Sequence, residues 1–453
     1  MRTLVAILIL WLAFSFSASA QTDSIVWHRA ADRVDADVRS LSLSNLLEQI
    51  TVQTGWQVYV EPGTTHRAST KFKNLPTGDA LRRLFGDLNF ALVLQTNAGP
   101  HLYVFTTRME NATQRVRAPK AMTAKHVPNE LLVKLKPGAD IDALAKAIGA
   151  KVIGRDDKLG IYRLQFTDAA ATDAALAQLK ADPNVEAVDY NYVYDPPPVP
   201  QLAANVPIGP VSLALDPPTP NDPCSPVVGL IDTSVQSLGS QLDPFMLKPI
   251  SVVGDVTAGS TDITHGTAMA QTILRGVSQQ NAGTGNVGSK VRILSVVVYD
   301  SGGTTTSWNV ALGVQAAVNN GATVLNLSLG GAADSAILDD VIQQTLGQGI
   351  MVFAAAGNQS GTMPTYPAAI PGVNAVTALG APGQLAPYAD YGSFVDMALP
   401  GTSVVYLGSQ AYVVQGTSAS TAYATGVAAG VKGINCDPWS QIQGAMQKRF
   451  PVP

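Results

Sequence analysis

Residues 227–234 read VVGLIDTS, an apolar run that ends on Asp232. Four later runs are also continuous in apolar and β-branched residues: VRILSVVVY (291–299), ATVLNLSL (322–329), IMVFAAAG (350–357) and VNAVTALG (373–380). Such continuous hydrophobicity is typical of strands that are buried on both faces, and segments of helical pattern separate the runs. The sequence therefore predicts an α/β fold, with a doubly wound parallel sheet as the main domain.

Polar residues follow three of these runs directly. Asp232 ends the first run, Ser328 follows VLNL, and Asn358 follows VFAAAG. Because ligands bind beyond the carboxyl ends of strands in open parallel sheets, we expect these three side chains to face one crevice.

Two further strings supply a base and a nucleophile. His265 lies in THGTAMA (264–270) and is the only histidine after His126, while Ser418 lies in QGTSAST (415–421). An acid that orients, a base that carries a proton and a hydroxyl that attacks are the parts of nucleophilic acyl transfer. The predicted catalytic residues are therefore Asp232, His265 and Ser418. The alternatives are that His265 has only a structural role and that Ser418 is an ordinary helix cap.

The four strings, in the order acid, base, asparagine and serine, resemble the subtilisin-like serine proteases over roughly residues 223–433. The resemblance implies that Asn358 donates its side-chain amide to the oxyanion, beside the backbone N–H of Ser418. It also implies a primary specificity pocket with Ser328, Leu329 and Gly330 on one wall, Ala355 and Gly357 on the other, and Thr365 at its base. We see no acid or base at these positions, so small to medium apolar side chains are the expected ligands.

No cofactor is expected. The family's calcium sites have no counterpart in the interval 262–291, where carboxylates do not cluster, although a weak Ca²⁺ site built from backbone carbonyls stays open.

A small unit precedes this domain, over residues 128–195. Its pattern is strand, helix, strand, helix, strand, a split βαβ arrangement that closes with VEAVDYNY (185–192). It resembles the inhibitory propeptide of subtilisin-like proteases. Residues 196–223 carry ten prolines and are expected to be a linker, because proline lacks a backbone donor and fixes φ.

Residues 21–108 form another small unit, with helical spacing over 43–50 and 81–85. The second half, ALRRLFGDLNFALVL (80–94), resembles the short N-terminal domain of secretins and TonB-dependent receptors; a generic α+β secreted domain is the alternative. Residues 109–127 are polar and without periodicity, so we expect a linker there.

The first twenty residues have the pattern of a secretory signal: a basic start, an apolar stretch and a small-residue site at 18–20. An uncleaved membrane anchor is the alternative, but the apolar stretch is short for a span. An exported protein, periplasmic or secreted and without a later membrane span, is expected. Cys224 and Cys436 flank the main domain and would form one disulfide in such a compartment, the alternative being two free thiols.

The chain has 453 residues, 14% of them charged, and a net charge of −4. Its length suggests about two to four domains, and its charge favours neither nucleic acid nor an anionic membrane as partner. The leading hypothesis is an exported serine endopeptidase that cleaves polypeptides through an acyl-enzyme and is made as a self-processing precursor. The alternative is a weakly active or inactive binding protein whose N-terminal domain docks a periplasmic or outer-membrane partner.

Overall fold

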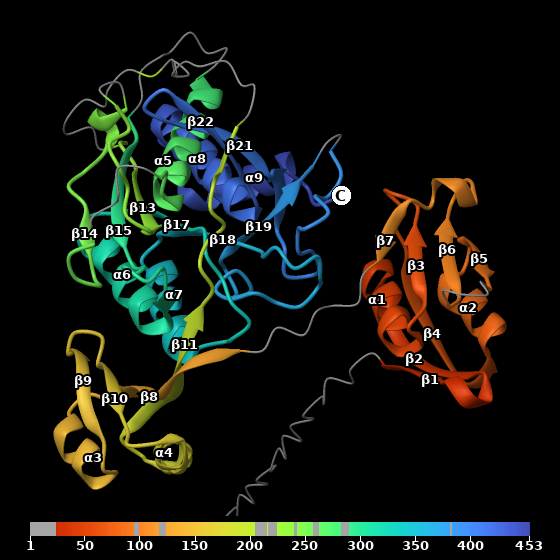
Figure 1. The fold of residues 1–453 in the computed structure, drawn as a ribbon, viewed down its shortest axis with the longest axis horizontal. Helices are drawn as coiled ribbons and strands as arrows, with labels where there is room; N and C mark the ends of the chain where they lie inside the picture. Colours follow the sequence, from red (N-terminus) through yellow and green to blue (C-terminus); the bar gives the residue numbers. More distant parts are fainter. Residues whose placement is uncertain are drawn as a thin grey trace, which may run out of the picture. The chain divides into compact units, whose positions relative to one another are not determined.

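A computed structural model describes residues 24–94, 99–116, 124–203, 215, 224–239, 242–256, 262–281, 290–380 and 383–453. The expected signal segment lies outside these residues. The chain forms two compact units, residues 1–116 and 117–453. We call residues 24–116 the N-terminal domain, 125–194 the middle domain and 224–453 the C-terminal domain (Figure 1).

The C-terminal domain is built on a seven-stranded parallel sheet in the order β14-β15-β13-β17-β18-β19-β20. All five apolar runs of the sequence are strands of this sheet, which confirms the predicted fold class. The strands are β13 (Val227–Asp232), β14 (Ile250–Ser251), β15 (Arg292–Val297), β17 (Val324–Leu327), β18 (Met351–Ala355), β19 (Asn374–Leu379) and β20 (Met397–Pro400).

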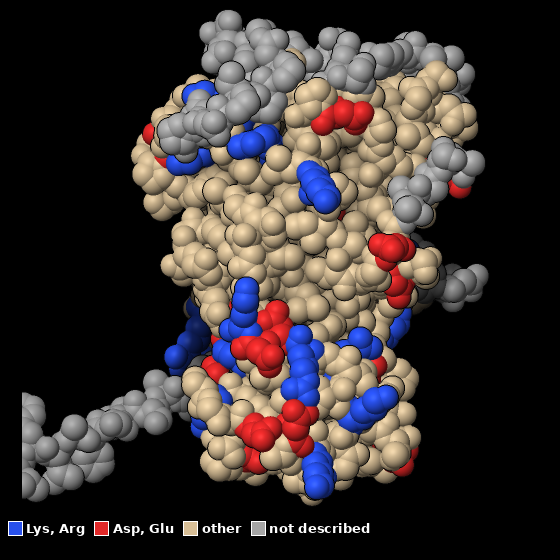
Figure 2. All heavy atoms as spheres, turned by 90° about the vertical axis from the view of Figure 1, so that its left-hand side faces the viewer, with Lys and Arg blue, Asp and Glu red and all other residues tan. Residues whose placement is uncertain are grey.

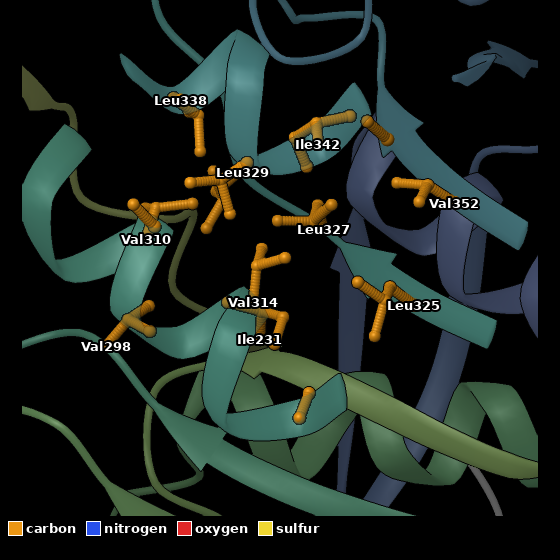
Figure 3. Close-up of a cluster of buried hydrophobic side chains, with 14 of the residues drawn as sticks. Ile231, Val298, Val310, Val314, Leu325, Leu327, Leu329, Leu338, Ile342 and Val352 are labelled. Carbon is orange, nitrogen blue, oxygen red and sulfur yellow. The ribbon is translucent and has the colours of Figure 1, made fainter. Parts of the chain in front are cut away.

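Helices cover both faces of the sheet. One face packs against α6 (Ser307–Asn319) and α7 (Ala336–Gly347). The close-up in Figure 3 shows this layer, where Ile231, Leu325, Leu327 and Val352 of the strands meet Val310, Val314, Leu338 and Ile342 of the helices. The other face packs against α5 (His265–Asn281), α8 (Thr417–Asn435) and α9 (Trp439–Arg449). Two separate apolar cores therefore hold the sheet from either side.

The helices α5 and α8 pack unusually close to one another. A Cβ atom on Gly426 of α8 would lie 2.0 Å from the carbonyl oxygen of Ile273 in α5, and one on Gly276 would lie 2.5 Å from that of Tyr423. Only glycine allows this approach. Because His265 begins α5 and Ser418 lies in the first turn of α8, the contact fixes the two helices that carry them.

The C-terminal domain also contains short antiparallel elements and a disulfide. Strands β21 (Thr402–Leu407) and β22 (Gln410–Gln415) form a hairpin before α8, and a 3₁₀ turn, η3, spans Asp243–Phe245. Cys224 and Cys436 are bonded, with their Cα atoms 5.2 Å apart, so the structure has the bridge and not two free thiols.

The middle domain has the predicted alternation of strands and helices with one difference: the single strand expected between the two helices is a pair of antiparallel strands. Its elements are β8 (Lys125–Leu135), α3 (Ile141–Ala147), β9 (Lys151–Asp156), β10 (Ile161–Gln165), α4 (Ala169–Ala181) and β11 (Val185–Tyr194). Its sheet has the order β11-β8-β10-β9, and both helices pack on one core beside it. The middle domain lies in the lower part of Figure 2, where Lys, Arg, Asp and Glu gather on the surface.

The sheet of the middle domain continues into the C-terminal domain. The edge strand β11 pairs antiparallel with β16 (Thr305–Thr306), with Tyr194 opposite Thr305. After β11 the chain runs along the C-terminal domain to β12 (Gln201–Leu202), which pairs with β22 (Figure 1). Part of the expected linker 196–223 is thus an added edge strand; residues 204–214 and 216–223 lie outside the described part.

The N-terminal domain has its own core between two sheets and two helices. One sheet has the order β1-β2-β4 and the other β5-β6-β3-β7. The elements are β1 (Ser24–His28), η1 (Arg29–Ala31), β2 (Arg33–Ser42), α1 (Leu43–Thr54), β3 (Gln57–Val60), β4 (Arg67–Pro76), α2 (Thr77–Phe85), β5 (Asn89–Val93), β6 (His101–Phe105), η2 (Met109–Asn111) and β7 (Gln114–Val116).

Two domain boundaries differ from the expected ones. The predicted linker 109–127 contains β7, which pairs with β3 and so belongs to the N-terminal domain. At its other end, Lys125 already pairs with Val193 in the middle domain. The first difference arises because β7 is an edge strand of three residues, too short to show a periodic pattern, and its partner β3 is distant in sequence. The second is an earlier start of the long strand β8, whose first residues pair with the end of β11.

Candidate active site

The predicted acid and base form a buried pair. Asp232 is the last residue of β13 and His265 the first of α5. The Nδ1 atom of His265 lies 2.8 Å from Oδ1 and 3.0 Å from Oδ2 of Asp232, and the two residues are 4% and 1% exposed. The backbone N–H of Thr233 also donates to Asp232, at 2.7 Å. The carboxylate therefore fixes the orientation of the imidazole, as acyl transfer by a histidine base requires.

The predicted nucleophile lies in the first turn of α8. Gly416, with φ 147°, precedes the helix, and Ser418 is 3% exposed. Backbone N–H groups at a helix start have no partner inside the helix and favour nearby negative charge. Ser418 is thus located where a developing oxyanion would be stabilised.

The hydroxyl of Ser418 points to a carbonyl in this structure. Its Oγ donates to the carbonyl oxygen of Ser328 at 3.1 Å, and the hydroxyl of Ser328 donates to the carbonyl oxygen of Ser418 at 3.1 Å. The Nε2 atom of His265 is buried and has no hydrogen-bond partner among the described residues. An unsatisfied buried nitrogen costs free energy, which favours a hydrogen bond from a hydroxyl group to Nε2. In this arrangement the Ser418 hydroxyl bonds to Ser328 instead.

Asn358 is fixed by the residue before the nucleophile. Its Oδ1 accepts from the backbone N–H of Thr417 at 2.9 Å and from the Thr417 hydroxyl at 3.2 Å. Because Oδ1 is engaged in this way, the Nδ2 group is the part of the amide that can donate to a ligand. Asn358 itself is exposed.

A cavity of about 380 Å³ brings most of the predicted site residues together. Asp232 and His265 are not among its lining residues. The predicted residues that do line it are Ser328, Leu329, Gly330, Ala355, Gly357, Asn358, Thr365 and Ser418. The methyl group of Thr365 approaches the Gly330 wall so closely that a Cβ there would be 2.5 Å away. Thr365 therefore narrows the space between the two walls.

Sequence reasoning missed other residues of this cavity. Asp390 and Tyr299 line it, and so does the chain segment 193–198 from the end of the middle domain. Asp390 follows β19 and is 2% exposed, so an acid does face the cavity where none was expected. It lies eleven residues beyond the end of β19, so the rule for polar residues directly after parallel strands does not reach it, and no recognisable string marks it.

Tyr194 anchors the incoming segment. Its ring is 1% exposed and packs on Gly331, where an added Cβ would lie 3.0 Å from the ring. Burial raises the pKa of Tyr194 and of the neighbouring Tyr299, so both phenols are neutral. Beyond Tyr194, the residues Asp195 and Pro196 to Pro198 pass along the cavity that contains Ser418.

Polar contacts hold the middle domain on two helix starts. Asn191 accepts from the Trp308 N–H at 3.3 Å, at the start of α6, and Asp189 accepts from the Ile337 N–H at 3.4 Å, at the start of α7. Burial raises the pKa of Asp189 despite these hydrogen bonds. Side-chain oxygens in such positions satisfy helix donors that otherwise lack partners.

An ion pair adds to this interface. Lys134 lies 2.8 Å from Asp340 of α7 and 2.9 Å from Glu186. Burial acts to lower the pKa of Lys134, but its bonds to Asp340 and Glu186 outweigh burial and raise it. The lysine is therefore charged.

The described residues contain no group of three or more His, Cys, Asp or Glu side chains that could hold a metal ion. None of their helices is long and apolar enough to cross a membrane.

Comparisons with known proteins agree with this geometry. Residues 225–448 match the Subtilase family, and residues 112–191 match the fervidolysin N-terminal prodomain. A thermostable alkaline protease of Halalkalibacterium halodurans is 30% identical over 269 residues, which cover 58% of this chain and 71% of the relative. Thermitase of Thermoactinomyces vulgaris is 32% identical over 203 residues, covering 44% and 72% respectively.

Among solved structures, fervidolysin from Fervidobacterium pennivorans, a keratinolytic enzyme related to subtilisin, has a similar fold. The TM-score is 0.55 at 18% identity, over 72% of this chain and 58% of that one. At this identity the likeness concerns the fold alone.

A doubly wound parallel sheet, a buried acid–histidine pair at the start of α5 and a serine in the first turn of α8 are the features of a serine protease. The chain belongs to the subtilase family. It is a serine-type endopeptidase whose middle domain is a fervidolysin-like prodomain. The alternative hypothesis, a weakly active or inactive binding protein, is not favoured.

Proposed function

We propose that Ser418 attacks the substrate carbonyl, that His265 takes its proton and returns it to the leaving amine, and that Asp232 stabilises the imidazolium. Asn358 Nδ2 and the Ser418 N–H would bind the oxyanion. The observation that carries this proposal is the buried pair of Asp232 and His265, at 2.8 Å, in a domain whose substrate cavity contains Ser418 and Asn358. Attack requires the Ser418 hydroxyl to leave the Ser328 carbonyl and turn to Nε2.

The pH dependence of kcat/KM on a peptide substrate tests the base. A protonated imidazole cannot accept the serine proton, so kcat/KM should fall as pH is lowered from about 8 to about 5. A flat profile over this range would rule out His265 as the base.

We also propose that the precursor processes itself. The segment between Tyr194 and β12 is held at both ends, by β16 and by β22, and passes through the cavity that contains Ser418. It thus blocks the site until the chain is cut.

Three consecutive prolines argue that the cut falls beyond Pro198. Pro196, Pro197 and Pro198 have no backbone N–H to pair with the cavity walls, and a bond to the nitrogen of proline is a tertiary amide with a fixed φ. Because residue 200 is also a proline, we place the first cleavage between residues 200 and 215. Sequencing the N-terminus of the mature enzyme tests this placement, and a mature chain that begins at residue 197 or 198 would contradict it.

For specificity, we propose small to medium apolar side chains in the pocket formed by Ser328 to Gly330, Ala355, Gly357 and Thr365. Support comes from the Thr365 methyl group, which narrows the pocket at Gly330. The Asp390 carboxylate does not change this proposal, because its Oδ1 already accepts two backbone N–H groups. We propose further that hydrolysis needs no cofactor, with a weak Ca²⁺ site as the alternative, so chelation with EDTA should leave kcat unchanged.

Finally, we propose that residues 1–20 export the protein to the periplasm or beyond. We propose that the N-terminal domain, which resembles the short domain of secretins and TonB-dependent receptors, docks a periplasmic or outer-membrane protein. The apolar stretch of the signal and the separate core of the domain support these proposals. Fractionation of the producing cells tests the first, and loss of co-purifying envelope protein on removal of residues 24–116 tests the second.

A further inference from the structure

Asn358 lies in the irregular segment between β18 and β19 and is exposed, yet an oxyanion donor must be held in place before the charge develops. Thr417 fixes the side-chain oxygen, as described above. The backbone of the loop needs a separate support, since Ser360 has a left-handed φ of 60° that is uncommon for a residue other than glycine.

Asp390 provides that support on both sides of Asn358. Its Oδ1 accepts from the N–H of Gln359 at 2.8 Å and from the N–H of Gly361 at 2.9 Å. Its own N–H donates to the carbonyl oxygen of Gly357 at 2.9 Å. The residues immediately before and after Asn358 are thus both bonded to the one residue Asp390.

Placing the Asp390 carboxylate at this point costs free energy, so an interaction that compensates for it is expected. Asp390 is 2% exposed and lines the cavity in which negative charge develops during acyl transfer. A carboxylate near that point opposes the oxyanion by Coulomb repulsion, and burial of the carboxylate itself is unfavourable. The two hydrogen bonds that Asp390 Oδ1 accepts from the loop stabilise the buried carboxylate and so offset these costs.

We propose that Asp390 is the positioning residue for the oxyanion donor: it holds the backbone on either side of Asn358 so that Nδ2 points into the cavity. This inference rests on the proposed role of Asn358. Asp390 itself does not touch the substrate in this account; it acts through Asn358.

The proposal is tested by a double-mutant cycle with a peptide anilide substrate, each variant being matured by a trace of the unmodified enzyme. Asn358→Ala alone should lower kcat by about 10²–10³-fold, the loss known for a comparable donor in a related protease. Asp390→Ala should lower kcat by about 10–10²-fold with KM nearly unchanged, since misplacing a group that acts mainly in the transition state affects kcat. Asp390→Asn keeps an acceptor oxygen and should restore most of the lost kcat.

In the Asn358→Ala background, Asp390→Ala should have almost no further effect on kcat, because the two residues act through one group. Asp396→Ala is the matched control: Asp396 also accepts a backbone N–H, that of Ala375 at 2.9 Å, in the same stretch of chain. It should leave kcat unchanged even if the melting temperature falls.

Three results would overturn the proposal: additive losses in the cycle, an equal loss of kcat in Asp396→Ala, or no rescue by asparagine. An unchanged kcat in Asn358→Ala would instead refute the proposed oxyanion role and leave a loss in Asp390→Ala without this explanation.

Discussion

Two small α+β domains precede the protease domain, and only the second of them shares a compact unit with it. The prodomain extends its sheet into the protease domain through β11 and β16 and places Tyr194 in the substrate cavity. The N-terminal domain forms a compact unit of its own, with a separate core. Similar size and similar elements therefore say little about role. What marks the prodomain is that its backbone pairing and its buried side chains continue into the catalytic domain.

The largest expected effect comes from the nucleophile. Ser418→Ala should abolish hydrolysis, with a loss of about 10⁶-fold in kcat, the scale known for triad serines. If the prodomain is removed by the domain on which it docks, this variant should also accumulate as the uncut precursor in a protease-deficient host. Appearance of the same mature fragment there would show that another protease makes the cut.

Removal of the prodomain comes next. A chain that begins near Asn221 should yield little active enzyme, because a large parallel sheet folds slowly through non-local contacts and the prodomain supplies an edge that binds β16. The measurement is casein hydrolysis per mole of purified chain. A chain from Asn221 with full activity would refute the folding role.

Tyr194 should contribute strongly to the block of the cavity. Replacing a fully buried aromatic side chain by alanine costs about 3–5 kcal/mol. Tyr194→Ala should therefore weaken prodomain docking by about 10²-fold or more and speed the appearance of activity in the purified precursor. As a matched control, Tyr192→Ala removes a half-buried tyrosine that is not among the residues lining the cavity, and should change the time course much less.

The smallest effect is expected from the N-terminal domain. A chain that begins at Lys125, behind the same signal, should mature and cleave casein at a rate within about twofold of the full chain, because a domain with its own core folds and unfolds separately. An inert product would mean that residues 24–116 take part in the enzyme, and the contrast between the two small domains would fail.

The sequence was sufficient for the features that are local. The five apolar runs predicted the strands of the parallel sheet because burial on both faces leaves a continuous pattern. The strings around Asp232, His265, Asn358 and Ser418 could be recognised because each lies at a strand end or helix start, where a few adjacent residues set the geometry.

Features that depend on pairing between distant residues were not predictable in this way. The strand β16 has two residues and no pattern, and it is a strand because β11 lies beside it. Asp390 belongs to a segment between β19 and β20 with no recognisable string, and its relation to Asn358 exists only in three dimensions. The hydrogen bond from Ser418 to Ser328 also follows from the packing of α8 against β17, and not from either motif.

The central claim is that Ser418 is an activated nucleophile in an assembled site, and covalent labelling tests it most directly. The matured enzyme is treated with a fluorophosphonate probe, digested, and the modified peptide is identified by mass spectrometry. The account predicts one label, on Ser418, that is lost in His265→Ala and is greatly slowed in the uncut precursor, where residues 193–198 line the cavity. Absence of label in an enzyme that still hydrolyses casein, or label on a different serine, would contradict it.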